Sequence, residues 1–197
     1  MEYGDESVIK ILNSSKIGTT GDLETGIYIN EELYMFQRNL FFDEKLSVLL
    51  PESFVDLPES IMKLKYPSEQ RPQIIKTNKA GGINFAFSLV DIPFQEDMVI
   101  EYRDNLKNIL KNMNPSMSFG ELKKEEVSGT FAGWFEFQNH VFDGILYNIM
   151  YCMPLDGKML HGIFNCMLQD MPFWKEVAIE VIKSIVDTTK ELDKEVR

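Results

Sequence analysis

Three strand-like runs rich in apolar residues lie between Thr130 and Leu168, and an Asp-Gly dipeptide separates each run from the next. The two dipeptides are Asp143-Gly144 and Asp156-Gly157. Asp-Gly between strand-like runs is a strong signal for a tight hairpin turn. The pattern therefore predicts three consecutive antiparallel strands joined by two short turns.

If each dipeptide is a two-residue turn, Phe142 faces Ile145 and Leu155 faces Lys158, and these pairs fix the register of the three strands. This register places three asparagines in one row across the strands: Asn139, Asn148 and Asn165. It also places three apolar residues in the row that borders them: Phe137, Met150 and Ile163. We take these six residues as candidate binding residues.

Three amides within an apolar surface allow two interpretations. Their donors and acceptors are suited to binding a ligand or a peptide at a fixed place on the sheet. Alternatively, the amides hydrogen-bond to one another or lie under a polar loop, since buried polar groups are nearly always paired. The sequence leaves both interpretations open.

The rest of the chain supplies further strands and two long helices. Extended runs at 45–50, 73–77, 82–92 and 116–127 predict strands, and 58–62 predicts one helical turn. Apolar residues at helical spacing predict amphipathic helices at 95–114 and 172–191. The strand at 158–168 is apolar on both faces, so both must be covered. We therefore expect the α+β class, with a mostly antiparallel sheet sandwiched between helices in an α/β/α arrangement.

Residues 1–40 show weaker periodicity. Turn-forming residues at 18–22 and a short strand candidate at 26–30 are the only features we identify there. We expect an irregular N-terminal leader over residues 1–40 and a single domain over 41–197, because 197 residues with 44% apolar composition suit one core.

Charge and hydropathy narrow the classes of partner. A net charge of −11 repels phosphate backbones, so nucleic-acid binding is disfavoured. The longest apolar runs are much shorter than the ~20 residues that span a bilayer, so the protein should not be membrane-embedded. The N-terminus is acidic and lacks the basic and apolar regions of a secretory signal, which favours a cytoplasmic location. The sequence does not indicate an oligomeric state.

The residues that could support catalysis or metal binding do not form a convincing set. The predicted register places Cys152 opposite His161 and Cys166 opposite Tyr147, with the two thiols on opposite faces, so we expect free cysteines. Neither pair has a further ligand for zinc or an acid to orient a catalytic histidine. No glycine-rich loop precedes a helix to hold phosphate. We therefore expect a protein without enzymatic activity, cofactor or metal.

Several motifs, taken in order, resemble a known fold. They are the run Leu49-Leu50-Pro51-Glu52-Ser53-Phe54, then Lys65-Tyr66-Pro67, Arg71-Pro72, Ile74 and Ile83-Asn84-Phe85, followed by a long helix, an antiparallel meander and a closing amphipathic helix. Over about residues 41–190 this order resembles the PsbP-like fold, and within it the bacterial DcrB-like branch. Proteins of this fold include a photosystem subunit, a Ran-binding import factor and chaperones of secreted effectors. The resemblance implies a non-enzymatic role in binding other proteins.

The leading hypothesis is a cytoplasmic, non-catalytic protein-interaction module, such as a chaperone or adaptor for a secreted effector, that uses a sheet face or a strand edge. The alternative is a small-molecule or lipid-binding module with the asparagine row in its binding site. An enzyme of unrecognised type is the third possibility. The identity of the partner does not follow from the sequence.

Overall fold

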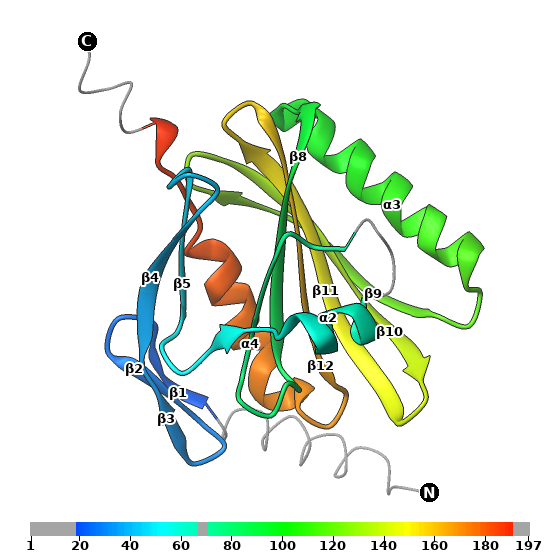
Figure 1. Ribbon diagram of the computed structural model, residues 1–197. Coiled ribbons are helices and arrows are strands. Elements are labelled where there is room, and N and C mark those ends of the chain that lie inside the picture. Colours follow the sequence, from blue (N-terminus) through cyan, green and yellow to red (C-terminus); the bar gives the residue numbers. More distant parts are fainter. Residues whose placement is uncertain (1–18, 67–70, 191–197) are drawn as a thin grey trace, which may run out of the picture.

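A seven-stranded antiparallel sheet is the centre of the computed structural model, which describes residues 19–66 and 71–190 (Figure 1). Its strand order is β6-β7-β8-β12-β11-β10-β9. The strands are β6 (Val55–Asp56), β7 (Ile74–Thr77), β8 (Asn84–Pro93), β9 (Ser118–Val127), β10 (Thr130–Val141), β11 (Gly144–Leu155) and β12 (Lys158–Met167). The strands expected in this part of the chain are therefore confirmed.

Two smaller sheets and three helices complete the fold of the described residues. One sheet has the order β1-β2-β3, with β1 (Thr19–Asp22), β2 (Gly26–Ile29) and β3 (Glu32–Tyr34). The other has the order β13-β5-β4, with β4 (Phe36–Phe41), β5 (Leu46–Pro51) and β13 (Val186–Asp187). The helices are α2 (Glu59–Lys65), α3 (Val99–Met113), which follows a 3-10 turn at Glu96–Met98, and α4 (Met171–Lys183). None of the described helices is long and apolar enough to cross a bilayer.

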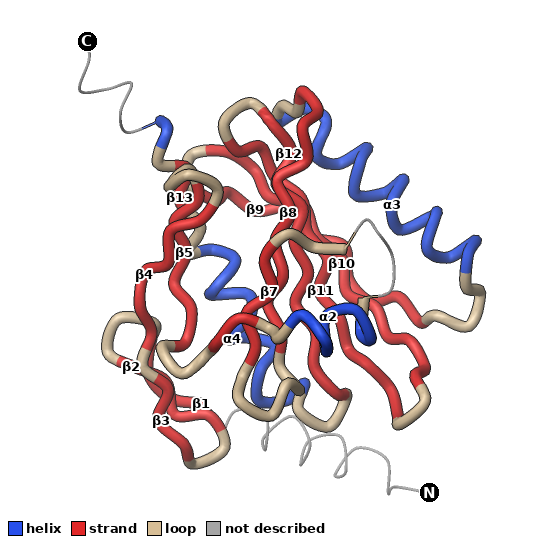
Figure 2. The backbone as a smooth tube through the Cα atoms, viewed as in Figure 1, coloured by secondary structure: helices blue, strands red, loops and turns tan. Residues whose placement is uncertain are grey.

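The two faces of the large sheet have different coverings. The face that carries Asn84, Asn148 and Asn165, which we call the asparagine face, packs against α2 and α3. The opposite face, the core face, packs against α4 and the β13-β5-β4 sheet in the largest hydrophobic core. Figure 2 shows α3 and α4 on either side of the strands. The mostly antiparallel α+β fold is confirmed, but a second sheet shares the core face, where we expected helices alone.

The two Asp-Gly dipeptides behave differently. Asp156 and Gly157 have φ values of 52° and 68°, as a type I′ turn requires, and Leu155 pairs with Lys158 as expected. The turn expected at Asp143-Gly144 is wrong. Its central residues are Phe142 and Asp143, and Val141 pairs with Gly144. Asp143 does not have the positive φ of a type I′ turn, so the turn lies one residue earlier than the sequence signal.

The stretch expected to be irregular is more regular than predicted. Residues 19–40 contain β1, β2 and β3 and most of β4, and the strand candidate at 26–30 is confirmed as β2. The turn-forming residues at 18–22 overlap β1 instead of a loop. Residues 1–18 lie outside the described residues. The leader at 1–40 and the domain at 41–197 stay a prediction, although Ile27, Ile29 and Phe36 belong to the largest core.

The last helix ends earlier than its apolar pattern predicts. It stops at Lys183, and the chain turns at Ser184 into β13, which pairs with β5. The Ser184 hydroxyl donates to the Val181 carbonyl at 2.7 Å and accepts the Leu49 N–H at 3.0 Å. Serine competes for backbone groups in this way and so favours a helix end. The apolar residues at Ile185 and Val186 continue the pattern but lie outside the helix.

Candidate functional site

The asparagines of the large sheet bond to each other. Asn84 Nδ2 donates to Asn165 Oδ1 at 2.9 Å, across the β8–β12 pair. Asn165 Nδ2 in turn donates to the Tyr66 hydroxyl at 3.1 Å, and Asn148 Nδ2 donates to Asn139 Oδ1 at 2.8 Å. Asn148 and Asn165 are only 4% and 7% exposed. These amides therefore stabilise one another, and Asn84, which the sequence did not single out, belongs to the same row.

The structure brings most of the candidate residues together, with one shift. Asn148 pairs with Asn165, and Met150 pairs with Ile163, as the predicted register requires. Because the β10–β11 turn is displaced, Phe137 lies opposite Asn148, within the asparagine row, and not in the row that borders it. Asn139 pairs with Leu146. Its amide still reaches Asn148, because the displacement of two residues keeps every side chain on the expected face.

The asparagine face is partly open where the core face is closed. On β11, the core-face side chains of Tyr147, Ile149 and Tyr151 are at most 3% exposed. On the other face of the same strands, two apolar pairs are only half-buried: Leu146 with Met167, and Met150 with Ile163. The described residues therefore leave an apolar strip on this face incompletely covered. We call these four residues the open strip.

Helix α3 is fixed to the sheet at its N-terminal end. A Cβ on Gly133 would lie 2.7 Å from Val99 Cγ1, so only glycine allows the first turn of α3 to approach β10 this closely. Val99 is fully buried, and the Arg103 guanidinium donates to the Lys123 carbonyl at 2.8 Å. Further along, Ile109 and Met113 are 54% and 76% exposed. The helix was predicted correctly, but half of its apolar stripe is uncovered by described residues.

Aromatic residues line the asparagine face below α3. Phe119, Phe135 and Phe137 form a cluster with ring centroids 5.8 to 6.1 Å apart. Lys107 of α3 places its ammonium group 5.8 Å from the Phe119 ring centroid, a cation–π distance. Phe119 is half-buried, so the edge of this cluster reaches the surface next to α3.

Helix α2 covers the other side of the asparagine face. Met62, Tyr66 and Ile163 pack against Leu57, Ile75 and Ala86 in a small separate core. Burial raises the pKa of the Tyr66 hydroxyl. The hydroxyl therefore stays protonated at neutral pH, and it accepts a hydrogen bond from the Asn165 amide. One end of the asparagine row is thus bonded to the end of α2.

The cysteines and His161 lie where the predicted β11–β12 register places them. Cys152 pairs with His161 and Cys166 pairs with Tyr147. Both thiols are free and buried, and burial raises the pKa of each to about 12. Burial lowers the pKa of His161. Within the described ranges, no group of three or more His, Cys, Asp or Glu side chains is placed to hold a metal ion.

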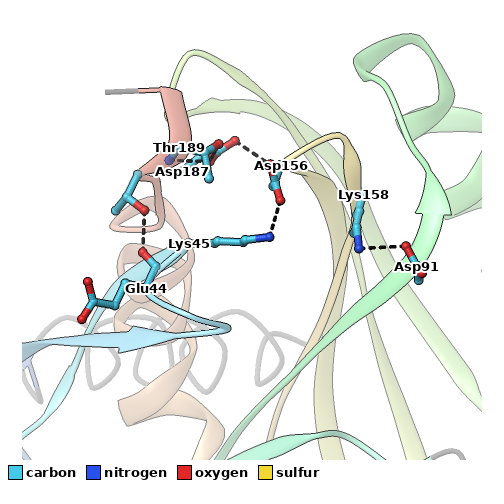
Figure 3. Close-up of polar contacts among 8 residues, drawn as sticks. Glu44, Lys45, Asp91, Asp156, Lys158, Asp187 and Thr189 are labelled. Carbon is cyan, nitrogen blue, oxygen red and sulfur yellow. Dashed lines mark hydrogen bonds and ion pairs between the residues drawn. The ribbon is translucent and has the colours of Figure 1, made fainter. Parts of the chain in front are cut away.

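A polar junction at one end of the sheet was not expected from the sequence. The Asp187 carboxylate accepts the Asp156 N–H at 3.2 Å and the Thr189 hydroxyl at 2.6 Å (Figure 3). The Asp187 N–H donates to the Ser128 hydroxyl at 3.0 Å, and Lys45 pairs with Asp156 at 2.6 Å. Asp187 is 2% exposed. The junction connects three turns and β13, so its evident role is structural.

Comparison with known proteins gives the fold. No family model matches the chain, and no curated protein matches it. Among solved structures it is similar to the cyanobacterial PsbP protein CyanoP of Synechocystis sp. PCC 6803, at 12% identity and a TM-score of 0.58, over 76% of this chain and 91% of that chain. The chain has a PsbP-like fold. At this identity the similarity concerns the fold alone.

Two further solved structures resemble this chain with lower TM-scores. One is PA94 of Pseudomonas aeruginosa, a protein of unknown function and putative regulator, at 10% identity and a TM-score of 0.41, covering 75% of this chain and 95% of that chain. The other is LpqN of Mycobacterium tuberculosis, which is involved in cell envelope biogenesis, at 13% identity and a TM-score of 0.48, covering 81% of this chain and 94% of that chain.

Proposed function

We propose that the chain is a non-catalytic protein-interaction module that holds an apolar segment of another polypeptide on its asparagine face. The observation that carries this proposal is the contrast between the two faces of β11 and β12. Core-face residues such as Ile149 are fully buried, whereas the side chains of the open strip on the other face are only half-buried. An apolar strip on a rigid sheet is the kind of surface that binds a partner.

The chemistry of the strip supports a polypeptide partner. Two of its four side chains are methionines, which adapt to different apolar surfaces because they are unbranched and polarisable. The amides of Asn148 and Asn165 are bonded to neighbouring side chains, so they are not free to select a small ligand by hydrogen bonding. The geometry therefore favours the protein-binding hypothesis over the small-molecule or lipid-binding alternative.

The resemblance to the DcrB-like branch leads us to propose a more specific role for this surface. A chaperone or adaptor for a secreted effector, of the DcrB-like branch and in the cytoplasm, would need a surface that accepts apolar segments of varied sequence. The open strip, bordered by α2 and α3, meets that requirement.

Charge placed on the strip tests the proposal. Met150→Glu introduces a carboxylate into the half-buried pair with Ile163, and Leu40→Glu is the control, because Leu40 is 52% exposed on β4 of a different sheet. Tagged wild-type and variant proteins would be recovered after crosslinking in the cells that make the protein. We expect a polypeptide that wild type and Leu40→Glu retain and Met150→Glu loses. Equal recovery by all three folded proteins would contradict the proposal.

A further inference from the structure

Two segments at the borders of the asparagine face contain basic residues but no carboxylate, although the whole chain is acidic. The net charge is −11, yet residues 71–90 and 105–120 contain no aspartate or glutamate and five basic residues: Arg71, Lys76, Lys79, Lys107 and Lys111. The first segment leads through β7 into β8, and the second contains the C-terminal half of α3 and the start of β9. Both segments border the asparagine face, but Lys76 does not add to its charge, because it pairs with Asp56 at 2.8 Å and lies over the Phe41 ring on the core-face side.

Two of these lysines stand beside the uncovered apolar surface. Lys107 lies over the Phe119 ring, and Lys111 is exposed one turn further along α3. Neither forms an ion pair with any carboxylate in residues 19–66 and 71–190. On the α2 side, the Lys65 ammonium donates to the Gly81 carbonyl. Cations therefore stand on both sides of the asparagine face.

Several carboxylates near this border are paired or lie away from the two lysines: Glu101 is in the first turn of α3, before Lys107 and Lys111, and Glu121 of β9 pairs with Lys123 at 2.8 Å. Strand β11 has no charged residue. The only carboxylate of β10, Glu136, pairs with Lys175 of α4 at 2.8 Å and so belongs to the core face. Asp104 of α3 forms an ion pair with Arg103, with 2.7 Å between Oδ1 and Nη2. The open strip therefore lies on a face whose borders at α2 and at the C-terminal half of α3 carry basic residues, on an otherwise acidic protein.

From this charge complementarity we infer that the partner segment is acidic as well as apolar, with carboxylates flanking the apolar residues that cover the open strip. The inference rests on the proposed function and adds the chemistry of the partner. Border charges of this kind speed association and select the partner, while apolar contact supplies most of the affinity. A basic amphipathic segment would meet Lys107 and Lys111 and be repelled, although it would suit the overall charge of the protein.

Selection from a random peptide library tests the inference with a defined probe. Peptides that bind wild type would be sorted by whether they still bind Met150→Glu, with Met167→Glu as a second variant of the open strip in case the first does not fold. We expect the strip-dependent peptides to be enriched in aspartate and glutamate next to apolar residues. Their binding should weaken as the salt concentration rises.

The lysines are tested with Lys107→Gln/Lys111→Gln, using Lys190→Gln as the control. Lys190 is also exposed, but it follows β13 on the core-face side. Removing both border charges should weaken binding of the acidic peptides about three- to thirty-fold, and the control should not change it. Strip-dependent peptides without acidic enrichment, or insensitive to the lysine variants, would overturn the inference and leave the proposed function standing. No strip-dependent peptides would overturn both.

Discussion

At the scale of single residues, Asn165 is both donor and acceptor in the asparagine row. It accepts from Asn84 and donates to Tyr66. Asn165→Leu would leave the Asn84 donor buried with only a long 3.5 Å contact to the Gly81 carbonyl. We expect a loss of about 1–3 kcal/mol in the free energy of unfolding, the usual cost of a buried unpaired polar group. Urea unfolding would measure it. Asn139→Ala, at the half-exposed end of the row, should cost less, and equal losses would contradict this reasoning.

The buried thiols give a second prediction. Because burial raises the pKa of Cys152 and Cys166 to about 12, both stay protonated at pH 8 in the folded protein, and only thiolates react with iodoacetamide. We expect slow alkylation of the folded protein and fast alkylation in urea, followed by mass spectrometry. Fast reaction of either cysteine without urea would show that the region around it opens readily.

His161 is expected to make the folded protein less stable at acidic pH. Burial lowers its pKa, so the folded state binds this proton less readily than the unfolded state. Titration of His161 leaves the free energy of unfolding unchanged above the unfolded-state pKa of about 6.5, and it destabilises the folded state as the pH falls below that value. We therefore expect His161→Gln to lose less stability than wild type between pH 7 and 5, measured by urea unfolding at each pH. Parallel curves for the two proteins would contradict this.

Single residues also show why the asparagine row and the row that borders it were only partly predictable. Asp156-Gly157 form the expected turn, with positive φ at both residues. Asp143 does not have a positive φ, and the other turn is centred on Phe142 and Asp143. A dipeptide signal does not specify which two residues occupy the centre of a turn. The faces were nevertheless correct, because a shift of two residues preserves the alternation of side chains.

At the scale of elements, α3 depends on Gly133 for its close contact with β10. Gly133→Ala would place a methyl group 2.7 Å from Val99 Cγ1, so the helix has to move away from the sheet. We expect a loss of about 1–3 kcal/mol in stability, as for other overpacked sites, and faster amide hydrogen exchange in α3. Gly82→Ala is the matched control, because nothing lies within 4 Å of its Cβ position. Unchanged exchange in Gly133→Ala would contradict this account of α3.

The helices were easier to predict than their surroundings. Periodicity identified α3 and α4, since apolar residues at helical spacing are a local signal. It could not show that Met113 would be 76% exposed, because exposure depends on strands distant in the sequence. The short strands β1, β3 and β13 were missed for a related reason. Runs of two to four residues carry too little periodicity, and pairing with other strands defines them.

At the scale of the whole molecule, the N-terminal strands share the largest core. Ile27, Ile29 and Phe36 are at most 8% exposed within it, and β4 pairs with β5 along its full length. We expect a protein comprising residues 41–197 to be less stable than the full chain by several kcal/mol, because each buried apolar side chain contributes roughly 1.5–3 kcal/mol. Thermal unfolding of the two proteins would measure it. Equal stability would support the leader expected over residues 1–40.

The polar junction around Asp187 also sets an order in time. A ribosome releases the chain from its N-terminus, so the turns at Ser128 and Asp156 emerge before the carboxylate that connects them has been made. The last strand of the large sheet, β12, ends at Met167, so the whole sheet is made before Asp187. Strand β5 is likewise made long before β13, with which it pairs in the completed fold. The final set of contacts can therefore close only when nearly all of the 197 residues have been synthesised. Until then, a growing chain exposes the apolar surface that later becomes its core.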